Sequence, residues 1–359
     1  MTVPNQPSPY AGLSDRPVFV GACPRSGTTL LRTMLNTHPD LAVPRETRYL
    51  LSIWENRAKW RGLSDKKKRT RLARVIYGSD WTQADRLRTA KEDAVSRFVE
   101  TPGTLGSLLG TTLVMYAEAT GKKRWGDKRP MYARYLDAIL GMFPDAQFIN
   151  VVRDPRASVA SMRKLGWFNG DMVPGVELWM RSVDAVAPWR DRLSPDQYLD
   201  IRYEDLVGDP ESLLQQITEF LGLSDSVQQM LRYYEKNDEQ SEKYHPRLNQ
   251  PVTTDTVRAW ESVLNPDEVA LIEKVSGQRM DQLGYERATT TQPSSSLMSS
   301  YRRHNRRVAV KRRKIELDEI RRRFDFREPV MAKLTTGQRE IAAPAPMPPF
   351  FQRHLGKPR

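Results

Sequence analysis

Residues 18–35 read VFVGACPRSGTTLLRTML, and this stretch decides the fold. The apolar run at its start predicts a buried strand, and the apolar spacing across residues 30–35 predicts a helix. Between them lies a loop with glycine and proline, whose successive backbone N–H groups point at the same spot as the helix N-terminus. The stretch therefore predicts a strand, a phosphate-binding loop and a helix, with an anion of the phosphate type as ligand.

This loop differs from the loop of a nucleoside triphosphatase. The triphosphate pattern places a lysine just before the serine or threonine, whereas here Gly27 is followed by Thr28 and Thr29. The positive charge comes earlier, from Arg25. Because kinases of this type rely on the lysine and on Mg²⁺, a P-loop kinase is an alternative that the sequence disfavours.

The composition limits the class of protein. The 359 residues suffice for one large α/β domain with additions, or for two domains. Of the net charge of +13, +12 belongs to residues 287–359, which hold 18 lysines and arginines against 6 acidic residues. The single cysteine, Cys23, excludes an intramolecular disulfide and reads as a small loop residue rather than a nucleophile. The four histidines have no metal-binding spacing, so we expect no metal site.

The N-terminus carries no recognisable targeting signal. Residues 1–16 are rich in proline and serine, and we expect a flexible segment there. They lack the charged and apolar regions of a secretory signal, and the chain holds no run of about 18 apolar residues that would span a membrane. We therefore expect a soluble, cytoplasmic protein.

A short second strand is predicted at Leu41–Val43, and Glu46 follows it. In an open parallel sheet, ligands lie beyond the carboxyl ends of the strands, so Glu46 should share a crevice with Arg25. A glutamate before a helix is also favoured by the helix dipole, which is the alternative role for Glu46. Residues 49–120 predict several helices with anchors such as Trp81; this insertion is too long for a simple crossover and suggests a lid or acceptor-binding region.

Residues 148–162, FINVVRDPRASVASM, give a second anion signal. Phe148–Val152 is a continuous apolar run of the buried-strand type, and Asp154 followed by proline is typical of a helix start. Arg153 therefore lies at the end of a strand beside a helix N-terminus, where it can hold an anion with Ser158 or Ser161. Alternatively, Arg153 pairs with a carboxylate.

The remaining segments are assigned more briefly. RWGDKRP at 124–130 is a polar segment ahead of a helix expected at 132–143, and on position alone Lys128 is an ordinary surface lysine. Tyr198–Tyr203 predicts a further strand, and the following residues predict helices at 210–223, 224–234 and 266–283. Residues 287–300 read as a low-complexity linker, and residues 301–359 as a basic helical and proline-rich tail.

Together these segments resemble the sulfotransferases that use 3′-phosphoadenosine 5′-phosphosulfate (PAPS). PRSGTTLL resembles their 5′-phosphosulfate loop, and VVRDPRASVASM resembles their 3′-phosphate motif. THPDLAVPRETR and WGDKRP resemble the glutamate and lysine segments of tyrosylprotein sulfotransferases and related bacterial enzymes. The resemblance covers residues 17–286 and implies an α/β fold: a P-loop-containing parallel sheet flanked by helices, with a helical insertion at 49–120 and the basic tail outside the domain.

The resemblance also implies roles at the two anion sites. The 5′-phosphosulfate would be held by the loop residues Arg25, Ser26, Gly27, Thr28 and Thr29. The 3′-phosphate would be held by Arg153 and Ser161, and Tyr203 would approach the nucleotide. PAPS carries an anion at each end of one adenosine, which fits two anion sites at neighbouring strand ends.

For the transfer itself, the resemblance implies that Glu46 is the general base for the acceptor hydroxyl. Lys128, together with Arg25, would stabilise the charge that builds on the departing phosphate, and Arg48 would face the acceptor. A sulfuryl group with one negative charge needs no divalent metal, in agreement with the absence of a metal-binding pattern.

The chain departs from the family pattern at two places. Gln250 stands where the family often has a lysine, and Arg247 is the candidate to replace that phosphate contact. The residues after Ser161, up to Leu165, lack an expected basic position, for which Arg163 is the candidate.

The sequence leaves the acceptor and the tail open. A carbohydrate, a lipid, a small metabolite or a tyrosine side chain are all compatible acceptors. The tail fits a nucleic acid or other polyanion, a membrane surface or another subunit of a homo-oligomer. A degenerate nucleotide-binding domain with a polyanion-binding tail is therefore a second alternative to the enzyme.

Overall fold

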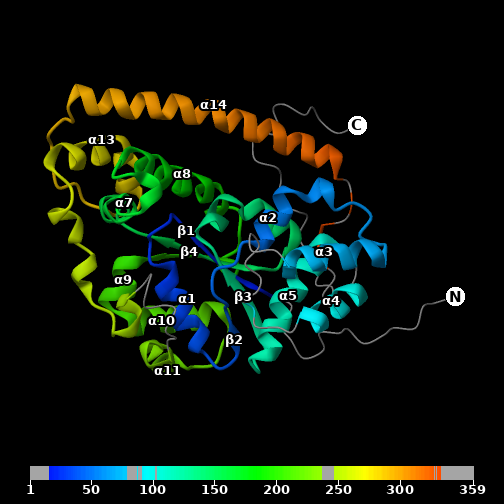
Figure 1. The fold of residues 1–359 in the computed structure, drawn as a ribbon. Coiled ribbons are helices and arrows are strands. Elements are labelled where there is room, and N and C mark those ends of the chain that lie inside the picture. Colours follow the sequence, from blue (N-terminus) through cyan, green and yellow to red (C-terminus); the bar gives the residue numbers. More distant parts are fainter. Residues whose placement is uncertain are drawn as a thin grey trace.

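The computed structural model describes residues 16–78, 87, 91–101, 103–236, 246–326, 328 and 330–332. Five strands form a parallel sheet in the order β2-β3-β1-β4-β5 (Figure 1). The strands are β1 (Val18–Ala22), β2 (Leu41–Ala42), β3 (Arg124–Lys128), β4 (Gln147–Val152) and β5 (Tyr198–Arg202). This architecture confirms the predicted α/β class.

Strand β1 lies at the centre of the sheet and is buried on both faces. Its side chains alternate between the faces, as expected for a strand. Phe19 packs in one core cluster with Trp125 of β3, while Val18 and Val20 pack in a second cluster with Ile149 of β4. The apolar run that predicted this strand thus reflects two hydrophobic layers, one on each side of the sheet.

Helices cover both faces of the sheet. The face of Val20 packs against α1 (Thr28–Thr37), α9 (Tyr203–Gly208), α10 (Pro210–Leu221) and α11 (Val227–Leu231). The face of Phe19 packs against the insertion, α2 (Tyr49–Glu55), α3 (Lys66–Gly78), α4 (Lys91–Glu100) and α5 (Leu105–Ala119), and against α6 (Leu136–Met142). A third cluster joins α7 (Pro155–Arg163), α8 (Val173–Arg190) and α13 (Pro266–Gln282).

The longest helix, α14 (Ser295–Asp325), runs along the outer edge of the molecule, past α13 and α8 (Figure 1). Tyr301 is buried in the cluster of α8 and α13. Arg312 lies 2.6 Å from Glu177 of α8, and Glu319 pairs with Arg57 of the short helix η1 (Arg57–Lys59). One side of the basic helix is therefore packed on the domain. No helix in the described ranges is both long and apolar enough to cross a membrane.

Several local predictions differ from the structure. The polar segment RWGDK is strand β3, between β2 and β1. The helix expected at 132–143 is split into η3 (Pro130–Arg134) and α6. Helix α14 begins at Ser295, inside the expected linker, because serine and aspartate side chains bind the amides at its start: the Ser294 amide donates to Asp267, and Leu297 donates to Ser294 Oγ. Residues 1–15, Trp81 and residues 333–359 lie outside the described residues.

Candidate functional site

The five strand ends bring the predicted site residues to one edge of the sheet. Arg25 follows β1, Glu46 follows β2, Lys128 ends β3, Arg153 follows β4 and Tyr203 follows β5. Because all five strands are parallel, their carboxyl ends meet at this edge. Ligands of open α/β sheets bind at such an edge, so the arrangement is that of a binding site.

The loop between β1 and α1 has the backbone geometry of an anion-binding nest. Arg25 has φ 69° and Gly27 has φ 89°, both in the left-handed region. Helix α1 begins at Thr28, so its first free amides follow the loop directly. A side chain at Gly27 would be too close to Tyr203, since its Cβ would lie 2.3 Å from Tyr203 Cδ2. The loop therefore needs glycine here, and it offers N–H groups to an anion.

The two predicted anion sites are in direct contact. Arg25 Nε donates to Ser161 Oγ at 3.0 Å, and one terminal nitrogen of Arg153 donates to the Arg25 carbonyl at 2.8 Å. The other donates to the Thr256 carbonyl at 2.8 Å. Burial lowers the pKa of both arginines, and the charge of Arg153 lowers the pKa of Arg25 further. An anion bound between the two guanidinium groups would relieve this repulsion.

Tyr203 links the loop to both neighbouring segments. The Arg153 guanidinium lies 4.1 Å from the centre of the Tyr203 ring, a cation–π distance. The Tyr203 hydroxyl is 2.6 Å from Thr256 Oγ1, in η7 (Thr254–Thr256). Thr256 was not found from the sequence, where it is one of several threonines in an irregular segment without spacing that distinguishes it.

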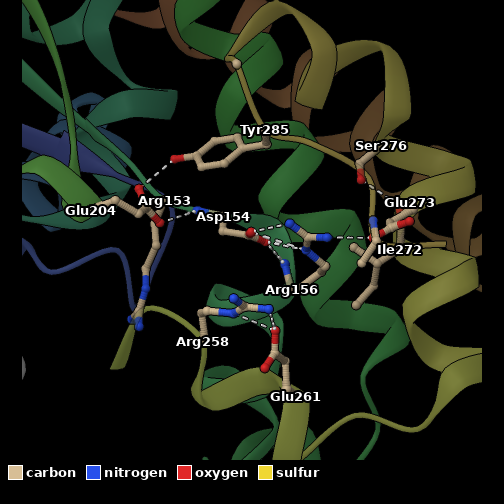
Figure 2. Close-up of polar contacts among 12 residues, drawn as sticks. Arg153, Asp154, Arg156, Glu204, Arg258, Glu261, Ile272, Glu273, Ser276 and Tyr285 are labelled. Atoms are coloured by element: carbon tan, nitrogen blue, oxygen red, sulfur yellow. Dashed lines mark hydrogen bonds and ion pairs between the residues drawn. The ribbon is translucent and has the colours of Figure 1, made fainter. Parts of the chain in front are cut away.

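A network of carboxylates surrounds the start of α7, next to Arg153 (Figure 2). Asp154 caps α7 by accepting from the Arg156 amide at 2.7 Å, which confirms the predicted helix start. Glu204 accepts from the Asp154 amide at 3.0 Å and from the Tyr285 hydroxyl at 2.9 Å. Arg156 in turn pairs with the buried Glu273 of α13 at 2.6 Å. The sequence did not reveal the contacts of Glu204 or the Arg156–Glu273 pair, because those partners lie far apart along the chain.

Glu46 and Lys128 form an ion pair at the other end of the site. Lys128 Nζ lies 2.9 Å from Glu46 Oε2 and donates to Thr29 Oγ1 at 3.3 Å. Arg129 Nε is 3.8 Å from the other carboxylate oxygen. The Lys128 side chain is 3% exposed and the Glu46 side chain 39%. The carboxylate is therefore partly open to solvent, while the lysine lies buried between it and the loop.

Burial shifts the pKa values of two neighbouring groups at the end of β3. The pKa of Lys128 is lowered by burial, and the Glu46 carboxylate partly opposes this. The pKa of Asp127 is raised to about 6, also by burial, although the Tyr132 hydroxyl and the Lys128 amide donate to it. Arg129 and Asp127 adjoin Lys128 in the sequence, but nothing in the local pattern marked them as part of the site.

The remaining loop residues are mostly buried. Within the described part of the chain, the hydroxyls of Ser26 and Ser158 are buried and have no hydrogen-bond partner. Thr28 is also buried. A cavity of about 10 Å³ lies behind the loop, lined in part by Cys23 and Ser26. Burial raises the pKa of the Cys23 thiol to about 12, so Cys23 stays a neutral thiol, in agreement with its interpretation as a small loop residue.

The substitutes suggested for the two sequence departures differ in their surroundings. Arg163 donates to Glu268 of α13 at 2.8 Å, so its guanidinium is engaged in an ion pair instead of facing the site. Arg247 and Gln250 are both exposed, and the Gln250 carbonyl accepts from the Tyr233 hydroxyl at 2.7 Å.

Comparison with known proteins decides the family. The model of the sulfotransferase family matches residues 17–227. This chain belongs to the sulfotransferase family. Protein-tyrosine sulfotransferase A of Caenorhabditis elegans is 26% identical over 291 residues, 79% of this chain and 68% of the relative. The omega-hydroxy-beta-dihydromenaquinone-9 sulfotransferase of Mycobacterium bovis is 27% identical over 175 residues, 45% of this chain and 41% of the relative.

Solved structures agree with this assignment. The sulfotransferase domain from the Synechococcus PCC 7002 olefin synthase is 26% identical, with a TM-score of 0.55, covering 79% of this sulfotransferase and 98% of that domain. The predicted family and enzyme class are thus confirmed, and the kinase alternative is not favoured.

Proposed function

We propose that this sulfotransferase moves the sulfuryl group of PAPS to a hydroxyl acceptor by in-line transfer. The observation that carries the proposal is the contact between two segments that are far apart in the sequence. Arg25 of the loop after β1 bonds Ser161 of α7, and Arg153 bonds the Arg25 carbonyl. Two cationic groups thus lie side by side at the carboxyl ends of the neighbouring strands β1 and β4. A donor with an anion at each end needs two such groups.

The residues present fit such a donor. The amides of the loop and of the α1 N-terminus, with Arg25, suit the 5′-phosphosulfate. Arg153 beside the α7 N-terminus suits the 3′-phosphate. The buried hydroxyl of Ser26, which lacks a partner among the described residues, is available to a bound oxygen. Tyr203, fixed between Gly27 and Arg153, offers a ring for the nucleotide to pack against.

The catalytic roles follow from the Glu46–Lys128 pair. PAPS supplies an activated sulfuryl group on a phosphate that can leave. Glu46, more exposed than its partner, accepts the proton of the acceptor hydroxyl. Lys128, between Glu46 and Thr29 of the loop, stabilises the negative charge on the departing phosphate together with Arg25.

The acceptor class rests on the relatives. Their names specify protein tyrosine and an omega-hydroxyl group of a menaquinone derivative, and both acceptors present a hydroxyl. Arg48, two residues after Glu46, is exposed where an acceptor would approach. The proposal includes a cytoplasmic location, supported by the free thiol of Cys23 and tested by cell fractionation.

Isothermal titration with adenosine 3′,5′-bisphosphate, without added metal, tests the donor site. We expect tight binding by the unaltered chain and binding weaker by about 10- to 100-fold in Arg153→Ala, because charge-assisted hydrogen bonds to the phosphate are lost. Arg192→Ala is the matched control, since Arg192 is an exposed arginine near the opposite end of β5. No binding by the folded protein, or equal loss in both variants, would refute the donor assignment.

The variant Glu46→Gln tests the catalytic role separately. We expect kcat for sulfuryl transfer to fall by about 10²- to 10⁴-fold, because the amide cannot accept the hydroxyl proton. Affinity for adenosine 3′,5′-bisphosphate should change by less than about tenfold, since Glu46 is not placed at either phosphate. Activity is measured with tyrosine peptides and with hydroxylated quinols as acceptors. A variant with unaltered kcat would show that Glu46 is only the helix-start carboxylate.

A further inference from the structure

The outward side of α14 is a continuous basic surface. Residues that recur every three to four positions lie along one face of a helix. The exposed residues on this face are Arg302, Arg303, Arg306, Arg307, Val310, Arg313, Lys314, Leu317 and Arg321, called the basic face below. Figure 1 shows α14 at the rim of the molecule.

The opposite side of α14 holds the helix in place. Tyr301 is buried, Arg312 pairs with Glu177 of α8 and Glu319 pairs with Arg57 of η1. The residues that make these inward contacts also follow the helical spacing, and they lie on the side of α14 opposite the basic face. The basic face is therefore presented by a helix whose orientation is fixed, and its 31 residues extend over about 45 Å.

Little of the charge of the basic face is neutralised locally: Arg321 lies 3.7 Å from Asp318 of the same helix. Among the described residues, no ion pair involves Arg306, Arg313 or Lys314. Among the acidic side chains of α14 that the structure describes, Glu316, Asp318 and Glu319 are half-buried. The face thus concentrates positive charge on a chain whose first 286 residues are nearly neutral.

Two exposed aliphatic side chains lie on the centre line of the basic face. Val310 is 74% exposed and Leu317 is 52% exposed, and seven residues, about two helical turns, separate them. A nucleic acid backbone attracts arginine and lysine but offers little to valine or leucine. A membrane surface accepts both, because basic groups meet anionic headgroups while aliphatic groups enter the boundary of the acyl chains.

We propose that the basic face of α14 docks this sulfotransferase on an anionic phospholipid bilayer. The helix lies flat on the surface, with arginine and lysine at the headgroups and Val310 and Leu317 inserted between them. The inward contacts keep the sheet and its site attached to the membrane-bound helix. This inference does not depend on the identity of the donor or the acceptor, because it uses only α14 and its packing.

Vesicle co-sedimentation tests the docking with the full chain. We expect binding to phosphatidylcholine vesicles that contain phosphatidylglycerol, and little binding to phosphatidylcholine alone. Arg306→Gln/Arg313→Gln/Lys314→Gln should weaken binding by about 100-fold, because each basic group at an anionic surface contributes about fivefold. The control Lys67→Gln/Arg71→Gln/Arg74→Gln removes the same charge from exposed positions of α3 and should change binding less than about twofold.

A second variant separates a bilayer from a polyanion. Val310→Ser/Leu317→Ser keeps every charge and should weaken vesicle binding by about tenfold, while weak binding to duplex DNA stays the same. Absence of binding to anionic vesicles would overturn the proposal. Tighter binding to DNA with no effect of the serine variant would reassign the face to nucleic acid, and equal loss in the α3 control would show that only net charge matters.

Discussion

Lys128 and Glu46 form an ion pair that is lost during the proposed reaction. Burial lowers the pKa of Lys128, and the Glu46 carboxylate at 2.9 Å acts in the opposite direction. If Glu46 takes the acceptor proton, as proposed, it becomes neutral, and its effect of raising the pKa of Lys128 is lost. Lys128 then becomes a stronger hydrogen-bond donor to the departing phosphate, and the base and the charge-stabilising group are coupled through this single contact.

The raised pKa of Asp127, the residue before Lys128, predicts a pH-dependent contribution to stability. Its pKa is raised from 3.8 to about 6 by burial, so the folded protein binds a proton there that the unfolded chain has lost. This contribution to stability is present below pH 3.8 and is lost as the pH rises to about 6. In Asp127→Asn, the free energy of unfolding relative to the unaltered chain should rise by about 3 kcal/mol across this range.

Urea unfolding at several pH values measures this difference. Asp209→Asn is the control, because the exposed Asp209 caps α10 and its pKa is lowered by Ser212. The stability that Asp209 contributes is lost as the pH falls, so its variant should show a pH trend of the opposite sign. Equal trends in the two variants would contradict the burial effect at Asp127.

At the scale of elements, β3 shows where sequence patterns fail. All five of its residues, RWGDK, are buried, yet three of them are charged. Arg124 donates to the Leu221 carbonyl, Tyr132 donates to Asp127, and Lys128 pairs with Glu46. Two of these three partners lie more than 80 positions away, and no local pattern can reveal them. Apolar runs did predict β1 and β4, because hydrophobic layers cover both faces of those strands.

The site residues likewise differ in whether a local sequence pattern predicts their position. Arg25 and Arg153 follow strands whose apolar runs are visible in the sequence, so their position at the sheet edge could be predicted. Lys128 follows from no such pattern, and its assignment depended on the family resemblance alone. Thr256 and Glu204 were missed, since each acts through contacts that exist only after the chain has folded.

Gly27 shapes the whole loop between β1 and α1, so its substitution tests whether the loop geometry is needed for binding. Gly27→Ala adds a Cβ 2.3 Å from Tyr203 Cδ2 at a positive φ. Gly121→Ala is a matched control, since Gly121 also has a positive φ, 69°, but has nothing within 4 Å of the added carbon. Both variants should lose about 1 kcal/mol of stability from backbone strain, and Gly27→Ala should lose more because its Cβ displaces the Tyr203 ring. Only Gly27→Ala should lose affinity for adenosine 3′,5′-bisphosphate, by more than about tenfold; equal affinities would mean that the loop geometry is not required.

At the scale of the molecule, the insertion and the C-terminal segment are held together. The Gly106 amide at the start of α5 donates to the Val330 carbonyl at 2.8 Å, and the Ala332 amide donates to the Met142 carbonyl at 2.8 Å. Glu328 accepts from the Leu63 amide at 3.2 Å. The charge distribution along the sequence predicted boundaries at residues 286 and 300. These contacts join residues on either side of both boundaries. The segments that the sequence divided therefore share one packed structure in the described residues.

The Arg57–Glu319 ion pair joins the insertion to α14. Arg57 is 2% exposed and lies 4.3 Å from the centre of the Trp54 ring, so Glu319→Ala leaves a buried guanidinium without its carboxylate. We expect a loss of about 3 kcal/mol in the free energy of unfolding. Asp318→Ala breaks the exposed pair with Arg321 on the same helix and should cost less than about 1 kcal/mol. Urea unfolding measures both losses; a loss of less than about 1 kcal/mol in Glu319→Ala as well would mean that this contact of α14 adds little to the stability of the domain.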